Sequence, residues 1–137
     1  MTDDEFLASF SACTLPPEQF SHAGHIRLAW INLQRLDFEP AVEATCRGIR
    51  AYATHLGAAT KFHATITVAL MHLLRAAGAG ERDISWYQFV NANQELMHDA
   101  RAVLARHYSS QLLDSQASRE RFVGPDLQPL PVRAAGP

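Results

Sequence analysis

Helical periodicity is the feature of this sequence that most limits its possible folds. Residues 37–57, DFEPAVEATCRGIRAYATHLG, repeat core-type side chains every three to four positions along one face: Val42, Thr45, Ile49, Tyr52 and Leu56. Pro40 suits the first turn of such a helix, and Gly57 suits the position just past its end. No segment alternates apolar and polar residues over the length of a strand. The sequence therefore predicts an all-α fold.

The remaining segments give the expected number and limits of the other helices. Helices are predicted over 2–13, 21–36 and 60–78, with Thr2 and Thr60 as N-caps. A short helix capped by Asp83, a longer one from about Asn93 and an amphipathic one within 109–123 follow. These patterns predict a single-domain compact bundle of about five to six helices over residues 1–137. The proline-rich residues 124–137 are expected to form an extended C-terminal tail.

Composition excludes several classes of protein. Hydrophobic residues make up 47% of the 137 residues and charged residues 19%, which is typical of a folded domain. The net charge is −2 and no basic run occurs, so nucleic acid is not an expected partner. The acidic start MTDDEFLASF is unlike a signal peptide, and no apolar run has the length of a membrane span. We therefore expect a cytoplasmic protein with no membrane partner.

Three histidines are the first candidates for chemistry. His22 and His25 are three residues apart on a predicted helix and so share one face. His63 lies in the first turn of another helix, which could run parallel to the first and bring its imidazole to the same end of the bundle. Three imidazoles around an open position are typical of a catalytic zinc or iron site, so a divalent transition metal is a possible cofactor. Without a metal, one neutral histidine could act as a general base. An ordered polar network in the core, or simple surface exposure, explains the same spacing.

The segment FHATIT predicts a second function for the helix start near His63. Free backbone N–H groups and the positive end of the helix dipole favour an anion there, with Thr65 and Thr67 as binding residues. The alternative is that both threonines return hydrogen bonds to the backbone and only close the helix.

Three stretches in a fixed order resemble a group of small bacterial proteins of unassigned activity. They are FSHAGHIRLAW, KFHATIT and ARHYSSQLLDSQASRERFVGPDLQPLP, which together reach from Phe20 to Pro131. The pattern in that group is Phe-x-His-x-x-His, then Tyr-His-x-Thr-x-Thr, then Arg-Tyr-Tyr-Ser, and finally Phe-Val-x-Pro-Asp. The residues of this chain that match it are His22, His25, His63, Thr65, Thr67, Tyr108, Ser109, Ser115, Arg119 and Asp126. The resemblance implies that these polar residues belong to one arrangement, and it transfers no activity.

Two positions depart from the pattern of that group. The tyrosine of the Tyr-His segment is Phe62 in this chain, which removes a hydroxyl group. The residue after the histidine is often glutamate in the proteins that the chain resembles, and it is Ala64 in this one. Both changes move the expectation away from catalysis by a carboxylate and towards binding, or towards a histidine base.

Taken together, these patterns predict a histidine-lined pocket that binds a small, anionic molecule. In the enzyme hypothesis, His22, His25 and His63 supply acid–base or metal-assisted chemistry. Arg119 would clamp the anion, and the other substrate-binding residues would be Thr65, Thr67, Tyr108, Ser115 and Asp126. A non-catalytic binding protein could use the same pocket. A third hypothesis is a protein-interaction module with a purely structural polar core, and a homodimer would fit it. The sequence does not decide between an enzyme and a binding protein.

Overall fold

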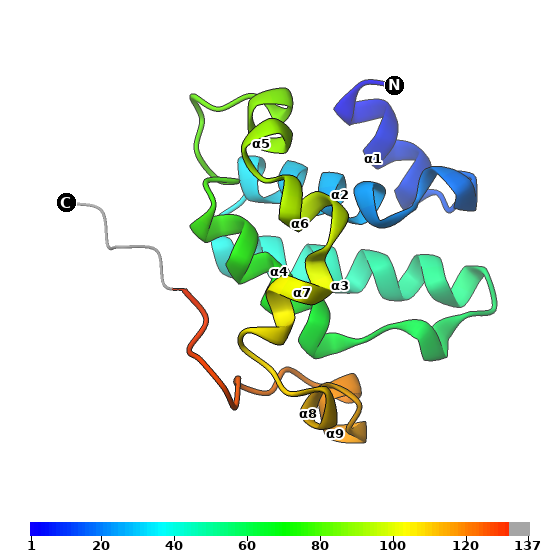
Figure 1. Cartoon of the computed structure of the whole chain (residues 1–137). Helices are drawn as coiled ribbons and strands as arrows, with labels where there is room; N and C mark the ends of the chain where they lie inside the picture. The colour runs from blue at the N-terminus through cyan, green and yellow to red at the C-terminus, as the bar shows by residue number, and fades with distance from the viewer. Residues whose placement is uncertain (132–137) are drawn as a thin grey trace. The chain divides into compact units, whose positions relative to one another are not determined.

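The computed structural model describes residues 1–131, and every regular element in that part of the chain is helical. It contains nine α-helices and two 3₁₀-helices and no strand, which confirms the predicted all-α class. Contacts divide the chain into two compact units, the first from Met1 to Phe62 and the second from His63 onward (Figure 1). The prediction of a single domain over 1–137 stays a prediction, and residues 132–137 lie outside the described part.

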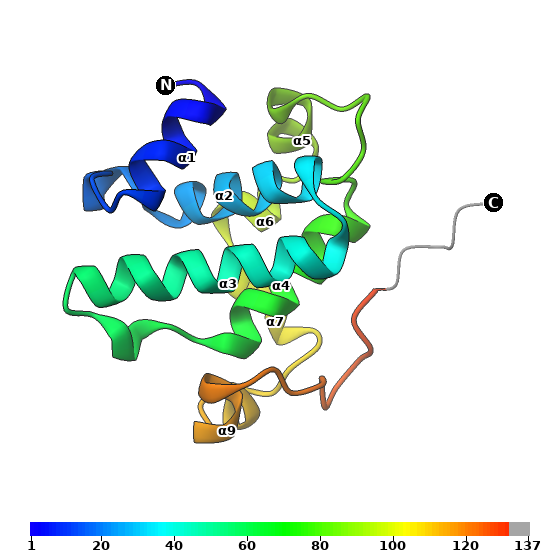
Figure 2. The same ribbon diagram turned by 180° about the vertical axis from the view of Figure 1, so that it is seen from behind.

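The first unit is built on three α-helices. They are α1 (Asp3–Ser11), α2 (His22–Arg35) and α3 (Phe38–His55), with 3₁₀-helices at Pro17–Gln19 and Ala59–Lys61. Helices α2 and α3 lie side by side and run in opposite directions (Figures 1 and 2). Thr2 caps α1 as predicted, because its side chain accepts from the Glu5 N–H while the Glu5 carboxylate accepts from Thr2. Gly57 takes the left-handed φ of +72° that ends α3.

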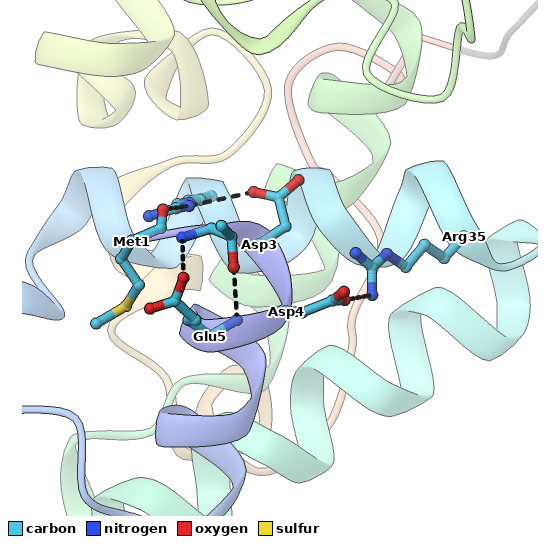
Figure 3. A network of polar contacts seen from close by, with 7 residues as sticks. Met1, Asp3, Asp4, Glu5 and Arg35 are labelled. Atoms are coloured by element: carbon cyan, nitrogen blue, oxygen red, sulfur yellow. Dashed lines mark hydrogen bonds and ion pairs between the residues drawn. The ribbon is translucent and has the colours of Figure 1, made fainter.

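Two arginines of α2 fix the start of α1 (Figure 3). The Arg27 guanidinium donates to the Met1 carbonyl over 2.8 Å and lies 3.2 Å from the Asp3 carboxylate. About two turns further along α2, Arg35 forms an ion pair with Asp4 at 2.8 Å. These exposed pairs each add little free energy, but together they set the register of α1 on α2.

Three buried aromatic rings form the centre of the first unit. The Phe10 ring lies 4.8 Å from that of Phe20 and 5.2 Å from that of Tyr52, and all three side chains are buried. The Tyr52 hydroxyl donates to the Leu15 carbonyl over 2.6 Å, which satisfies its polar end. This cluster holds α1 and the loop after it against α3.

The second unit contains six shorter helices. They are α4 (Ala64–Ala76), α5 (Trp86–Ala92), α6 (Gln94–His98), α7 (Ala100–Ala105), α8 (Ser110–Leu113) and α9 (Gln116–Glu120). Helix α4 contacts both α7 and α9. Residues 122–131 contain no helix, and the extended tail over 124–137 stays a prediction. No helix within residues 1–131 combines the length and the apolar character needed to cross a membrane.

The second unit has more helices than the periodicity predicted because polar caps interrupt the expected ones. The helix predicted from about Asn93 is split at Asp99, whose carboxylate accepts from the Ala102 N–H and starts α7. Two of the predicted caps were wrong. His63, not Thr60, caps α4, and Ser85, not Asp83, caps α5. The segment 109–123 forms two short helices because Ser109 and Ser115 each begin a new one.

Candidate functional site

His63 uses both ring nitrogens to hold the backbone of the second unit. Its Nδ1 lies 3.1 Å from the Ile66 N–H and accepts from it, so Nδ1 carries no proton. Its Nε2 lies 2.7 Å from the Leu113 carbonyl and must therefore be the protonated nitrogen that donates. The neutral imidazole thus caps α4 and ties the end of α8 to it. In this arrangement neither nitrogen is left for the metal ion or the proton transfer expected from the sequence.

The two threonines of α4 also bond to the backbone. Thr67 donates from Oγ1 to the His63 carbonyl over 2.8 Å, which is the helix-closing alternative. Thr65 instead donates to the Arg121 carbonyl at 2.9 Å and accepts from the Val123 N–H at 3.0 Å. With 0% of its surface exposed, Thr65 fastens the segment after α9 to α4. Their hydroxyl groups are thus occupied by the chain itself.

Tyr108 and Asp126 hold the same C-terminal segment from the other side. The Tyr108 hydroxyl donates to the Val123 carbonyl over 2.7 Å, and burial raises the pKa of Tyr108 to about 12. The Asp126 carboxylate accepts from the Ser109 hydroxyl at 2.6 Å and from the Ser109 N–H at 2.8 Å. These hydrogen bonds lower the pKa of Asp126. The structure therefore brings these predicted residues together, as parts of one structural network.

Helix α9 contributes one bonded serine, one unbonded serine and an exposed arginine. Ser115 donates to the Leu112 carbonyl over 2.7 Å and accepts from the Ser118 N–H. Ser118 is 0% exposed, and its Oγ has no hydrogen-bond partner within the described residues. Arg119, the predicted anion clamp, has its side chain on the exposed surface of α9.

Replacing Ser118 with alanine is expected to raise the free energy of unfolding by about 1 kcal/mol. The substitution removes a buried hydroxyl that has no partner and so no longer has to be desolvated. Ser115→Ala is the matched control on the same helix, and its lost cap should cost about 1 kcal/mol. Urea unfolding followed by circular dichroism measures both. A Ser118→Ala protein less stable than the parent would show that the hydroxyl makes a stabilising contact.

His25 differs from His63 because one of its nitrogens remains a free base. Its Nδ1 lies 2.9 Å from the Ser21 carbonyl and donates to it, so the lone pair is on Nε2. The ring stacks on Phe20 with centroids 4.0 Å apart. Burial lowers the pKa of His25 from its ordinary value of 6.5, and the nearby His22 lowers it slightly further. His22 itself is the exposed first residue of α2.

The lowered pKa of His25 predicts a loss of stability in mild acid. The unfolded chain takes up a proton on His25 near pH 6.5, and the folded chain does so only at lower pH. Stability from this group is therefore complete above pH 6.5 and falls as the pH drops below it. We expect the free energy of unfolding to fall more between pH 7.5 and 5.5 for the parent than for His25→Gln, as measured in urea. Equal pH dependence of the two proteins would contradict the assignment.

The predicted three-histidine metal site has no support in the geometry. Across residues 1–131, no group of three or more His, Cys, Asp or Glu side chains is placed to hold a metal ion. The hydrogen bonds of His63 described above give one physical reason, since they use both of its nitrogens.

A cleft of about 390 Å³ in the first unit is a different candidate site. All three helices of that unit, together with the turn after α1, line it. Its apolar lining is Leu7, Phe10, Leu28, Ala44, Gly48 and Ala51, and its polar lining is Ser11, Cys13, Asn32 and Arg47. None of these ten residues carries a carboxylate. The sequence reasoning named none of them as a site residue.

Gly48 is required by the close approach of α1 to α3. A Cβ atom at this position would lie 2.8 Å from the Phe10 ring, which the aromatic cluster holds in place. A glycine inside an otherwise clear helix often marks such a contact. It was therefore a signal in the sequence for the position of the cleft.

The polar residues of the cleft differ in burial and bonding. Cys13, a free thiol, is the one non-glycine residue with a positive φ in the described chain, at 58°. Arg47 is exposed, and no carboxylate within residues 1–131 forms an ion pair with it. Asn32 is 9% exposed and donates from Nδ2 to the Thr45 hydroxyl over 2.9 Å. The cleft thus presents a mostly apolar wall with a guanidinium and a buried amide.

Comparison of the chain with models of protein families, with curated proteins and with solved structures gave no match.

Proposed function

We propose that this chain is a small-molecule-binding protein whose ligand occupies the cleft of the first unit. The observation that carries the proposal is the cleft itself, about 390 Å³ in volume and mostly apolar in lining. Ligand pockets in proteins have volumes of about 300–1,000 Å³ and combine apolar walls with a few placed polar groups. The expected small-molecule partner is retained in this proposal, but the lining is not the histidines that the sequence suggested.

Charge favours a ligand with an anionic group. Arg47 contributes the one formal charge of the cleft lining, and no carboxylate in the described chain neutralises it. A guanidinium binds a carboxylate through two parallel N–H donors, and an apolar wall beside it strengthens that interaction. The proposed ligand is therefore an apolar molecule with one carboxylate.

Three of the four polar lining groups favour binding over catalysis. The hydroxyl of Ser11, the amide of Asn32 and the guanidinium of Arg47 recognise ligands but do not exchange protons readily near pH 7. The imidazole of His25 stacks on the Phe20 ring and is not part of the cleft lining. A binding protein is accordingly the first proposal.

A second candidate function, acid–base catalysis, is favoured by one observation at His25. Its Nδ1–H is anchored on the Ser21 carbonyl, and burial lowers its pKa, so Nε2 is an oriented, unprotonated base at pH 7. In this hypothesis the substrate would approach the start of α2 and not the α1–α3 cleft. If the His25→Gln substitution leaves ligand binding in the cleft unchanged, the cleft and His25 would belong to two separate sites.

Isothermal titration calorimetry with octanoate and octanol tests the binding proposal. We expect octanoate to bind about tenfold more weakly to Arg47→Gln than to the parent, because that variant lacks the charge-assisted hydrogen bonds. Arg50→Gln is the matched control: Arg50 is on the same helix, but its guanidinium lies over the Phe62 ring, outside the cleft. Octanol should bind weakly and equally to all three proteins. Octanoate binding that is absent, or equal in the parent and Arg47→Gln, would overturn the proposal.

A further inference from the structure

Asn32 is an unusual residue for the interior of a helix pair. It lies near the end of α2 in a run of buried residues, and only 9% of its surface is exposed. A buried side-chain amide costs free energy unless its donors and its acceptor are hydrogen-bonded. Burial of Asn32 therefore avoids this free-energy cost only if both the N–H donors and the oxygen of the amide have hydrogen-bond partners.

One end of the amide has its partner in the protein. The Nδ2 atom donates to the Thr45 hydroxyl of α3 at 2.9 Å, and Thr45 is only 1% exposed. This contact fixes the side chain of Asn32 between the two helices. In this orientation Nδ2 faces Thr45, and Oδ1 lies at the opposite end of the amide.

The other end has no partner in the protein. No donor within the described residues bonds to Oδ1, and this oxygen is not among the fully enclosed atoms that lack a partner. Asn32 lines the cleft, so the cleft is the candidate route by which a ligand reaches this oxygen. It is an oriented acceptor inside a mostly apolar wall.

We infer that the ligand of the cleft donates a hydrogen bond to Oδ1 of Asn32. This inference rests on the proposed function and narrows the ligand to one chemical class. The class is a carboxylic acid whose apolar body also carries an N–H or O–H group, such as an indole carboxylate or a hydroxyaryl carboxylate. The carboxylate pairs with Arg47, the apolar body lies against Phe10 and Leu28, and the N–H or O–H meets the amide oxygen.

A site that holds an acceptor for a ligand donor discriminates against analogues that lack the donor. Binding such an analogue removes water from the amide oxygen without replacing its hydrogen bond. The matched pair of indole-3-acetate and 1-naphthaleneacetate differs in this respect, since both have a bicyclic ring and a carboxylate but only the indole has an N–H. We expect indole-3-acetate to bind to the parent about tenfold more tightly, as measured by calorimetry.

Variants at the Asn32–Thr45 pair separate ligand recognition from folding. In Asn32→Leu the two probes should bind with about equal affinity, because the acceptor oxygen is gone. In Thr45→Val the preference should become smaller without disappearing, because the acceptor remains but the hydrogen bond that orients it is lost. If Asn32→Leu does not fold, the affinities of the parent protein for indole-3-acetate and 1-naphthaleneacetate still test the inference.

The outcomes distinguish this inference from the proposed function. Equal affinity of both probes for the parent, with Arg47→Gln weakening both, overturns the hydrogen bond to Asn32 and leaves the proposed function intact. A preference that persists in Asn32→Leu overturns the inference in the same way. Binding of neither probe overturns the inference, and with octanoate also unbound it overturns the proposed function.

Discussion

Thr65→Val is expected to lower the free energy of unfolding by about 3 kcal/mol. The substitution keeps the shape of the side chain but removes the hydroxyl that donates to Arg121 and accepts from Val123. Thr65 is fully buried, so its two backbone partners lose a protein contact that water can replace only in part. The C-terminal segment would then lack both hydrogen bonds of the Thr65 hydroxyl that join it to α4. Urea unfolding followed by circular dichroism gives the change in free energy.

Thr65→Ser is the control for this prediction. Serine keeps the hydroxyl and loses only one methyl group, so a smaller loss of about 1 kcal/mol is expected. Hydrogen exchange adds a local readout, because the Val123 amide bonds to Thr65 and should exchange faster in the valine variant. Similar stability of the valine and serine variants would show that the hydroxyl does not hold this segment.

Phe10→Ala is expected to lower the free energy of unfolding by about 3–5 kcal/mol. The ring is 4% exposed, contacts the rings of Phe20 and Tyr52, and fills the space above Gly48. Its removal leaves a cavity in the centre of the first unit and takes away a wall of the cleft. A thermal or urea unfolding curve measures the loss, and calorimetry with octanoate should show weakened binding in any folded fraction.

Phe10→Leu is the control for this prediction, because it keeps most of the apolar volume of the side chain and removes the aromatic ring. Leucine retains most of the buried apolar surface, and its cost should be about 1–2 kcal/mol, within the range for large-to-smaller core substitutions. A loss below about 1 kcal/mol in Phe10→Ala would mean that the aromatic cluster does not organise the first unit.

Local sequence signals predicted the fold well where a single helix was involved. The buried face of α3 at Thr45, Ile49 and Tyr52, the Thr2 cap and the Gly57 end all depend on residues within a few positions of each other. The prediction was wrong at Leu56, which is 45% exposed, and Val42 is only half-buried. The start of α4 and the breaks between the helices of the second unit were harder to predict. Competing caps occur close together in the sequence, and tertiary contacts select among them. His63 is such a case, since its selection as the α4 cap accompanies its bond to Leu113, fifty residues away.

The candidate site was predicted less well because polar residue types do not reveal their partners. Thr65, Tyr108 and Asp126 were expected to bind a substrate, yet each bonds to a distant part of its own chain. The cleft depends on side chains from three helices, so no short motif marks it. Gly48 and Asn32 were the available signals: a glycine inside a helix, and an amide inside an apolar run.

An octanoate titration followed through the amide NMR signals of the protein tests whether the cleft of the first unit binds a ligand. If the cleft binds the ligand, the signals of Ser11, Cys13 and Gly48 shift together with one dissociation constant. The signals of α8 and α9, far along the chain in the other unit, stay in place. Shifts confined to the second unit, or no saturable shift at any concentration, would contradict a ligand site in the α1–α3 cleft.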